Sequence, residues 1–330
     1  MKAATYHRYG SPDVVTITEV PRPGIGDTEI LVQVSATSVT TADWRLRAAA
    51  FPGAMALPGR LMFGLFKPKN PLLGNNFAGH VVARGEAVKS FKLGDAVFGF
   101  AASGAHAEYV KIDASGPVVL QPETLGPDQA AAIPFGGLSA LVFLRDFAKL
   151  RAGERILIGG ASGGVGVFAV QIAKDMGAEV TAVASGRNSG LLRDLGADHV
   201  VDYKTDDPAA FGPYDVILDT AGTLPYAKAR RMLTPTGRYV PLEFSFREIW
   251  QALTAPLRGG RRVILRVSTD TQEDLTQLRD MAERGALRPV IDSTYPLDAI
   301  AKAHAKVETR HASGAVIVTV DAPEAPRQAA

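Results

Sequence analysis

Residues 159–166 read Gly-Gly-Ala-Ser-Gly-Gly-Val-Gly and carry the strongest local signal in the chain. They follow a short apolar stretch, Ile156–Ile158, and precede apolar residues at helical spacing from Val165 to Met176. Such a strand, glycine turn and helix let a backbone approach a pyrophosphate at the helix N-terminus. The fit to A-x-G-x-x-G predicts a dinucleotide site formed by Ala161, Ser162, Gly163, Gly164, Val165 and Gly166.

The same turn also spells G-x-S-x-G around Ser162, the pattern of a serine hydrolase nucleophile. A hydrolase needs an acid and then a histidine, and Asp219 or Asp292 followed by His304 or His311 satisfies that order. However, no HGGG-like segment precedes the turn, and its last glycine has no role in a hydrolase. A serine hydrolase therefore stays a remote alternative, and a P-loop is excluded because no Lys-Ser/Thr follows the glycines.

The second half of the chain alternates strands and helices. Strands are expected at 179–184, 199–201, 215–219, 237–242 and 262–267, and helical periodicity covers segments between them. This alternation is typical of a doubly wound α/β domain with a parallel sheet, which we place at residues 124–269.

The first half has short alternating strands separated by Pro and Gly turns, which predicts an antiparallel β domain over residues 1–123. The β-branched stretch 315–320 is expected to return to this domain, so that residues 270–330 complete it. Residues 321–330 read as a disordered tail.

Residues at the end of the second α/β strand indicate which dinucleotide binds. An NAD site places Asp or Glu there, whereas this chain has Ser185 and Arg187. A hydroxyl and a guanidinium can bind a 2′-phosphate, so NADP(H) is favoured as cofactor. Tyr203, after the third strand, either adds a contact to the same phosphate or is a plain strand-end tyrosine.

Composition excludes several other classes of protein. The 330 residues are 46% hydrophobic and 21% charged, as in a soluble globular protein of about two domains. A net charge of +2 without a long basic run argues against nucleic acid, and zero cysteines exclude disulfides and cysteine-ligated zinc. No secretory signal is evident, and the apolar stretch 51–66 is interrupted by prolines and an arginine. We therefore expect no nucleic-acid partner, no membrane span and a cytoplasmic location.

Residues 51–71 form an unusually apolar segment rich in Gly and Pro. We expect a long loop here, and its composition fits a lid over a binding site and an ordinary packed loop equally well.

Several stretches in order resemble one family, the medium-chain dehydrogenase/reductase superfamily, in its zinc-free quinone-oxidoreductase-like branch. The resemblance covers nearly the whole chain. The matching pieces are TSVTTADW (37–44), LGNNFAG (73–79), FKLGDAVF (91–98), IGGASGGVG (158–166), LGADHVVDY (195–203) and HASGAVIV (311–318).

This resemblance implies a GroES-like N-terminal domain, completed by the C-terminal segment, with a Rossmann domain inserted. It also implies NADPH as hydride donor, a homodimer built through an edge strand such as 262–267, and a substrate wall that includes Thr40, Phe51, Asn75 and Asn76. Departures from the family pattern fall on the same residues. Asn75 and Thr40 replace metal ligands of the zinc enzymes, Asn76 replaces an aspartate, and Phe51 replaces a tyrosine of some relatives.

Other polar candidates are expected to be structural. We expect Asp43 to cap or pin a helix rather than act as a base, and His80 to be structural rather than catalytic. We expect His304 and His311 to be structural or surface residues rather than metal ligands. No metal site and no catalytic residue is assigned.

The sequence thus predicts an NADPH-dependent, zinc-independent reductase that transfers hydride to a small-molecule acceptor, a quinone or an activated C=C bond of the enone type. A quinone disperses the negative charge that it receives, so it does not require an acid from the protein. A nucleotide-binding protein with little turnover is the main alternative.

Overall fold

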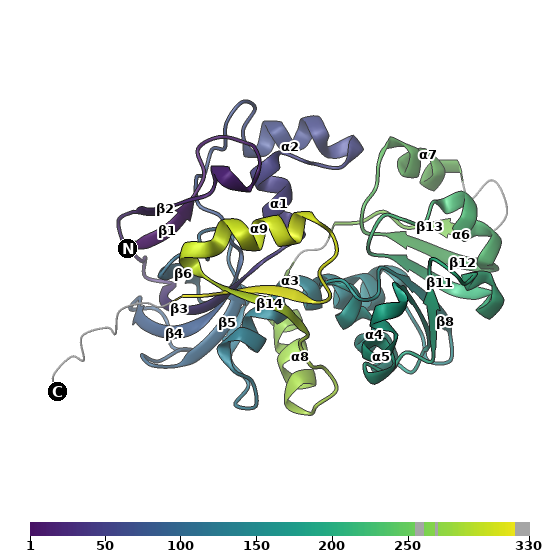
Figure 1. Ribbon diagram of the computed structural model, residues 1–330. Coiled ribbons are helices and arrows are strands. Elements are labelled where there is room, and N and C mark those ends of the chain that lie inside the picture. Colours follow the sequence, from purple (N-terminus) through teal and green to yellow (C-terminus); the bar gives the residue numbers. More distant parts are fainter. Residues whose placement is uncertain (255–260, 268–269, 321–330) are drawn as a thin grey trace.

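The computed structural model describes residues 1–254, 261–267 and 270–320, and their strands form three sheets. An antiparallel domain lies at one end of the molecule and a parallel-sheet domain at the other (Figure 1). The predicted combination of a Rossmann domain with a GroES-like antiparallel domain is confirmed. Residue 269 and the proposed tail 321–330 lie outside the described residues, and the domain boundaries stay predictions.

The parallel sheet has six strands in the order β10-β9-β8-β11-β12-β13. When the strands are numbered within the domain, this order is 3-2-1-4-5-6, which is the Rossmann order. All strands run parallel, and the order in which they are added to the sheet reverses between strands 1 and 4. The strands are β8 (Arg155–Gly159), β9 (Glu179–Ala184), β10 (His199–Asp202), β11 (Tyr214–Asp219), β12 (Leu233–Pro241) and β13 (Arg262–Val263).

Helices cover both faces of this sheet, which explains its continuous apolar strands. Along β8, Ile156 and Ile158 pack into one core with helices α3, α4 and α8, while Leu157 between them packs against α6 on the opposite face. The helices in the order of the chain are α1 (Thr41–Ala48), α2 (Ala56–Phe63), α3 (Pro127–Val142), α4 (Gly166–Asp175), α5 (Ser189–Asp194), α6 (Tyr226–Met232), α7 (Phe246–Thr254), α8 (Gln272–Glu283) and α9 (Ile300–Glu308).

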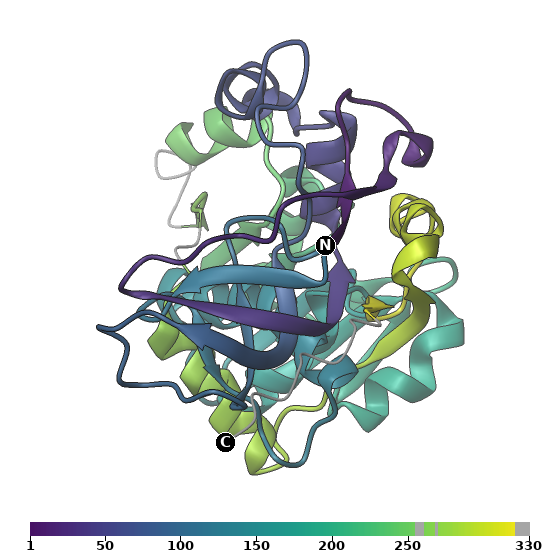
Figure 2. The same cartoon turned by 90° about the vertical axis from the view of Figure 1, so that its left-hand side faces the viewer.

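The larger antiparallel-domain sheet is built around the long strand β3 (Glu29–Val39), which pairs with β4 (Asn76–Arg84), β6 (Tyr109–Asp113) and β15 (Ala315–Thr319). The expected return of the C-terminal strand is confirmed, since Ile317 lies opposite Ser38. The remaining strands are β5 (Ala96–Phe100), β7 (Val118–Leu120) and β14 (Ile291–Pro296), with β1 (Lys2–Thr5) and β2 (Thr16–Glu19) forming a separate pair. Figure 2 views this domain from its outer side.

Helix α3 joins the two domains. Its apolar side chains share one core with Ala78 and Phe98 of the antiparallel sheet and with the first strand of the parallel sheet. With the π-helical segment Phe143–Ala148 that continues it, the helix Pro127–Ala148 is long and apolar enough to cross a membrane, but most of it is buried inside the molecule. Because most of this apolar helix is buried, it fits the core helix that joins the two domains.

Two expectations about elements are corrected. Residues 51–71 are not a long loop, because 3₁₀ helix η2 (Gly53–Met55) and helix α2 lie within them. Pro58 falls in the first turn of α2, where a missing N–H costs no hydrogen bond. The expected strand 262–267 is also shorter, since only Arg262 and Val263 pair with β12, its one described neighbour in the sheet.

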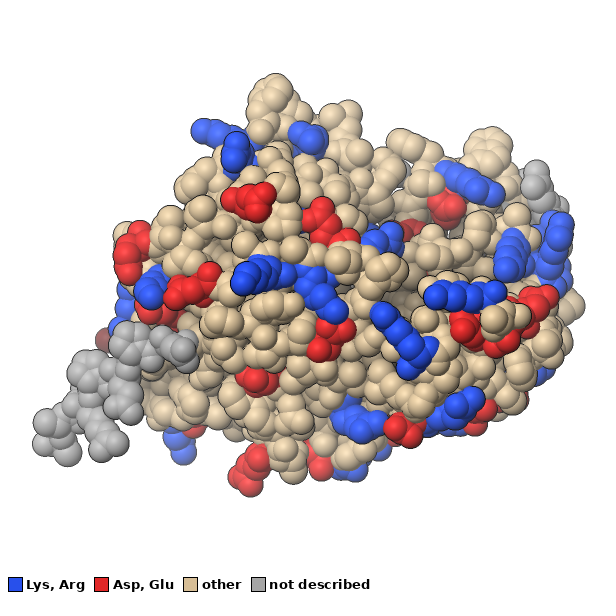
Figure 3. Space-filling model, viewed as in Figure 1, with Lys and Arg blue, Asp and Glu red and all other residues tan. Residues whose placement is uncertain are grey.

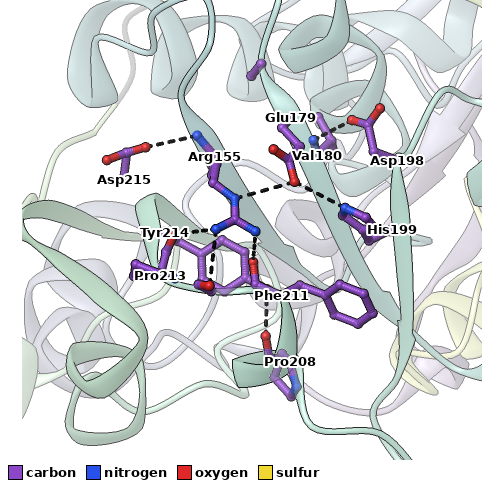
Figure 4. A network of polar contacts seen from close by, with 12 residues as sticks. Arg155, Glu179, Val180, Asp198, His199, Pro208, Phe211, Pro213, Tyr214 and Asp215 are labelled. Carbon is purple, nitrogen blue, oxygen red and sulfur yellow. Dashed lines mark hydrogen bonds and ion pairs between the residues drawn. The ribbon is translucent and has the colours of Figure 1, made fainter.

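A polar network holds the amino ends of the parallel strands, opposite the glycine turn (Figure 4). Arg155 Nη1 donates to the Gly212 carbonyl at 3.1 Å, and its Nε lies 3.4 Å from the Glu179 carboxylate. The same carboxylate contacts His199 Nε2 at 3.1 Å. Because these residues begin β8, β9 and β10, we infer that the network maintains the register of the strands and is not part of a binding site.

Candidate active site

A cleft of about 990 Å³ lies between the two domains, at the carboxyl ends of the parallel strands. This is the place where open α/β sheets bind ligands, next to the reversal of strand order. The cleft is lined by Ser162, Gly163, Gly164 and Val165 of the glycine turn, by Ser185, Arg187 and Tyr203, and by Thr40 and Asn76 of the antiparallel domain. Nine of the residues expected from the sequence therefore meet in one cavity.

Close packing excludes a side chain at one position of the glycine turn and at one position of α3 that faces the turn. A Cβ on Gly166 would lie 2.3 Å from the Gly160 carbonyl oxygen, so only glycine fits where α4 packs against the end of β8. A Cβ on Gly136 of α3 would lie 2.2 Å from the Gly164 carbonyl oxygen. Ala161 and Gly166 do not line the cleft but form the base of the turn.

The turn presents backbone donors to the cleft. Within the described chain, the N–H groups of Ser162 and Gly164 donate to no protein acceptor. The Ser162 carbonyl accepts from Gly314 N–H at 2.9 Å, which ties the turn to the antiparallel domain. A backbone bare of side chains with free N–H groups fits the pyrophosphate of a dinucleotide.

Arg187 lies at the turn after β9 and crosses to the other domain, where its Nη2 donates to the His311 carbonyl at 3.1 Å. Ser185 and Tyr203 line the same region of the cleft. Two acidic residues that the sequence analysis did not consider lie close by. Asp206 also lines the cleft, and the Asp202 carboxylate is so near that a Cβ on Gly186 would lie 2.4 Å from it. These two residues approach the turn because β10 packs beside β9, and the spacing of residues along the sequence does not show that packing.

On the opposite wall, Thr40 is the N-cap of α1. Its hydroxyl donates to the Asp43 carboxylate at 2.7 Å, and Asp43 also accepts from Thr40 N–H at 2.8 Å and Gly74 N–H at 3.1 Å. The expectation that Asp43 caps and pins this helix is confirmed. Because Asp43 is fully buried and saturated with donors, it fixes the wall rather than contacting a substrate.

Asn76 joins three elements. Its Nδ2 donates to Ser38 Oγ at 2.6 Å, and its Oδ1 accepts from Phe135 N–H at 3.1 Å. Phe135 follows Pro134, whose ring crowds the helical carbonyl four residues earlier and which itself has no N–H. The Asn76 side chain thus supplies the acceptor at the point where the proline disturbs α3.

Phe51 and Asn75 do not line the cleft. Phe51 stacks on Phe63 of α2 with ring centroids 5.7 Å apart, and Asn75 Nδ2 donates to the carbonyls of Ala101 and Ala102 at 2.9 and 3.0 Å. Both residues support the segments around the cleft.

A charged group crosses the mouth of the cleft. Glu243, after β12, forms ion pairs with Arg45 of α1 and, at 3.3 Å, with Arg310 after α9. Arg310 also donates to the Ala221 carbonyl at 2.6 Å. All four residues line the cleft, and the sequence analysis missed them because the partners are distant in the chain.

The histidines are arranged differently from the pair that the sequence juxtaposes. His304 is fully buried beside His106, with ring centroids 5.7 Å apart, whereas His311 lies at the cleft. Burial, with smaller contributions from the neighbouring His106 and Arg47, holds the pKa of His304 well below its usual value. His304 is therefore neutral at pH 7.

No hydrolase triad is assembled around Ser162. Asp219 accepts from the N–H groups of a turn that includes Leu224, at 2.9 Å, and Asp292 pairs with Lys306 at 2.9 Å. Neither carboxylate contacts a histidine among the described residues. The geometry gives the hydrolase alternative no support.

Comparison with known proteins supports the family. Residues 26–132 match the alcohol dehydrogenase GroES-like domain, and residues 195–318 match the zinc-binding dehydrogenase domain. A chloroplastic quinone oxidoreductase of Triphysaria versicolor is 32% identical (96% of this chain, 98% of the relative), and a trans-enoyl reductase of Aspergillus terreus is 33% identical (90% and 88%).

Two further proteins extend this. A mitochondrial NAD(P)H oxidoreductase of Homo sapiens is 31% identical (97% of this chain, 89% of the relative). The structure of the quinone oxidoreductase from Coxiella burnetii superposes with a TM-score of 0.86 at 28% identity (97% and 99%). The chain belongs to the medium-chain dehydrogenase/reductase superfamily, in its quinone-oxidoreductase-like branch, and is an oxidoreductase.

Zinc does not fit the residues present, despite the name of the second matching domain. The chain has no cysteine, and the described residues contain no group of three His, Asp or Glu side chains that could hold a metal ion. Asn75, at the position of a metal histidine in the zinc enzymes, uses its amide on backbone carbonyls.

Proposed function

We propose that this protein is an NADPH-dependent, zinc-independent reductase that transfers hydride to a quinone or an activated C=C bond. The observation that carries the proposal is the shared cleft, in which the glycine turn and Arg187 lie across from Thr40 and Asn76. The printed names of the quinone oxidoreductase and trans-enoyl reductase relatives support the two acceptor classes.

NADPH, when bound, supplies a hydride from its nicotinamide ring. The chain's own part is to bind and orient. The N–H groups of Ser162 and Gly164 would hold the pyrophosphate, and Arg187, with Ser185 and Tyr203, would hold the 2′-phosphate. The Asp202 carboxylate near Gly186 works against that preference, so Arg187 is the residue on which the choice of NADPH over NADH depends.

The wall contributed by the antiparallel domain favours an acceptor that needs no proton from the protein. The Thr40 hydroxyl is committed to Asp43, and both polar atoms of the Asn76 amide already have partners. A quinone can disperse the added charge over its two conjugated oxygens and an enone over its oxygen and α-carbon, and water can supply the proton, so positioning in the cleft suffices.

The test is NADPH oxidation, followed by loss of reduced-nicotinamide absorbance, with ortho- and para-quinones, an enone and an aldehyde, each repeated with NADH. We expect acceptor-dependent oxidation with the quinones or the enone that is faster with NADPH. NADPH binding without oxidation by any acceptor would favour a nucleotide-binding protein with little turnover.

We further propose a cytoplasmic homodimer that pairs through β13, the edge strand of the parallel sheet. An edge strand exposes unpaired backbone donors and acceptors, which a second copy can satisfy. Light scattering of the purified protein should give twice the mass of one chain. A proline at Val263 should reduce that mass to a monomer.

A further inference from the structure

Exposed apolar side chains are concentrated beside the mouth of the cleft. Ten of the fourteen large apolar side chains that are exposed in the described chain lie in two segments, 55–66 and 246–253. They are Met55, Leu57, Leu61, Met62, Phe63, Leu65, Phe66, Phe246, Trp250 and Leu253, and we call them the apolar rim. Soluble monomers rarely expose such a cluster unless it binds something.

The two segments form one surface. Helices α2 and α7 lie at the same end of the molecule in both views (Figures 1 and 2). The chain before α2 touches the chain before α7, since a Cβ on Gly53 would lie 2.7 Å from the Ser245 Cβ. Met55 of the rim also lines the cleft, together with Pro52 and Phe244 just before the two segments, so the rim is continuous with the mouth of the cleft.

Helix α7 has the pattern of a helix that lies flat on an interface. Phe246, Trp250 and Leu253 follow at i, i+4 and i+7, so they share one face, and Trp250 is 67% exposed. In the other segment Phe66 is 88% exposed, with Leu57 and Leu61 one helical turn apart. Tryptophan, phenylalanine and leucine on one face are typical of helices that insert shallowly into lipid.

The charges of segment 55–66 and its neighbours are positive, and the one acid within segment 246–253, Glu248, is partly buried and accepts hydrogen bonds from Ser245. No Asp or Glu occurs from residue 44 to 85 or from 249 to 269, whereas the first range includes Arg60, Lys67 and Lys69. None of these three forms an ion pair with a described residue; Arg60 and Lys69 donate to the carbonyls of Leu65 and Leu61 instead. In Figure 3 the crest over α2 is tan with blue groups, and the red groups lie below it. A cationic border complements an anionic surface.

We propose that the apolar rim docks on an anionic lipid bilayer and holds the mouth of the cleft against it. The apolar side chains would enter the headgroup region, and Arg60, Lys67 and Lys69 would contact lipid phosphates. A second part of this inference rests on the proposed function: the acceptor is a lipophilic quinone or enone that enters the cleft from the membrane.

The test of docking needs no catalysis. The full-length protein is sedimented with vesicles of phosphatidylcholine alone and of equal parts phosphatidylcholine and phosphatidylglycerol, at low and high salt. We expect sedimentation with the anionic vesicles that weakens at high salt. The variant Phe66→Ser/Trp250→Ser should lower the partition coefficient by about tenfold or more, because two of the largest exposed side chains are lost.

Leu93→Ser is the matched control, since Leu93 is 59% exposed but lies outside the rim. It should sediment like the wild type. Circular dichroism and NADPH affinity of each variant show whether it is folded. If wild type stays in the supernatant, or the double variant sediments as well as wild type, the proposal is overturned. If the wild type is a dimer that does not sediment with vesicles and the double variant is a monomer, the rim is an interface between two copies.

A second measurement separates this proposal from the enzyme function. With a water-soluble quinone, wild type and double variant should oxidise NADPH equally, whereas with a long-chain quinone in anionic vesicles the variant should be slower by about tenfold. Failure of both proteins with every acceptor would refute the reductase and leave the vesicle result standing.

Discussion

Arg45 and Glu243 come from different domains and form an ion pair across the mouth of the cleft. Both side chains are about one-fifth exposed, so water screens the pair only partly. Arg310 approaches the same carboxylate from a third direction. One carboxylate therefore pairs with two guanidinium groups at the place where the domains meet.

Glu243→Gln should lower the free energy of unfolding by about 1 to 2 kcal/mol, because the largely buried Arg45 and the exposed Arg310 lose their shared partner. Urea denaturation without cofactor measures this. Glu283→Gln, which removes an exposed pair with Arg279 at 3.9 Å, is the control and should change stability by less than about 0.5 kcal/mol. Equal effects of the two substitutions would show that the interdomain pair has no special role.

Arg187→Ala should weaken NADPH binding by about tenfold or more and leave NADH almost unchanged, since only NADPH carries the extra phosphate. Fluorescence titration with each cofactor gives the two dissociation constants. Arg193→Ala removes a nearby arginine outside the cleft and should affect neither. If Arg187→Ala weakens both cofactors alike, our interpretation of the turn after β9 is wrong.

Gly166→Ala should destabilise the protein by about 2 to 3 kcal/mol, because the new methyl group overlaps the Gly160 carbonyl. NADPH affinity should fall with it, as the turn shifts to make room. Gly190→Ala offers a matched control in α5, where a Cβ meets nothing within 4 Å, and should raise stability by up to about 1 kcal/mol. Thermal unfolding of both variants distinguishes crowding at the turn from a general effect of alanine.

Asn76→Ala should cost about 2 kcal/mol, because the partly buried Phe135 N–H and the buried Ser38 hydroxyl lose their partner. The adjacent Asn75→Ala should cost less than about 1 kcal/mol, since Asn75 is half-buried and water can reach the carbonyls that it leaves. Chemical denaturation of the pair gives both values. A larger loss for Asn75→Ala would contradict the role that we assign to Asn76.

Asp198 is expected to make the free energy of unfolding depend on pH in the acid range. Burial alone would raise its pKa, but hydrogen bonds from Lys174 Nζ and Val180 N–H outweigh burial and hold the pKa below the usual 3.8. A lowered pKa means that the fold prefers the carboxylate, so this contribution is complete above pH 3.8 and is lost as the pH falls through the folded-state pKa.

We expect Asp198→Asn to cost about 1 kcal/mol at pH 7, with the difference from wild type shrinking below about pH 4. Unfolding curves at several pH values, compared with those of the exposed-site variant Asp194→Asn, measure it. A difference that persists unchanged at low pH would rule out the charge on Asp198 as its origin.

Sequence patterns predicted those parts of the protein that depend on short spacings. The glycine turn, the strands beside it and the capping role of Asp43 each involve residues within one strand, turn or helix, and the structure has them as expected. The return of β15 to β3 was also predicted, because a β-branched strand after the last helix has few other places to pair.

Features that require two distant segments were not predictable in this way. Glu243 meets Arg45 only because β12 ends and α1 begins at the same cleft, and Asp202 reaches Gly186 through the packing of neighbouring strands. Helix α2 was missed for a different reason. Its one proline and one glycine favour a loop locally, whereas packing such as that of Phe51 on Phe63 and Gly59 supports a helix.

The two domains contact each other in two places that differ in chemistry, one apolar along α3 and one charged at the mouth of the cleft. Along α3 the domains share an apolar core that includes Phe98 and Ile158, whereas at the mouth they meet through Arg45, Glu243 and Arg187. Dissolved salt screens charges but does not weaken apolar packing. A motion that admits a dinucleotide is therefore expected to be a rotation about α3, with an amplitude that grows as ionic strength rises.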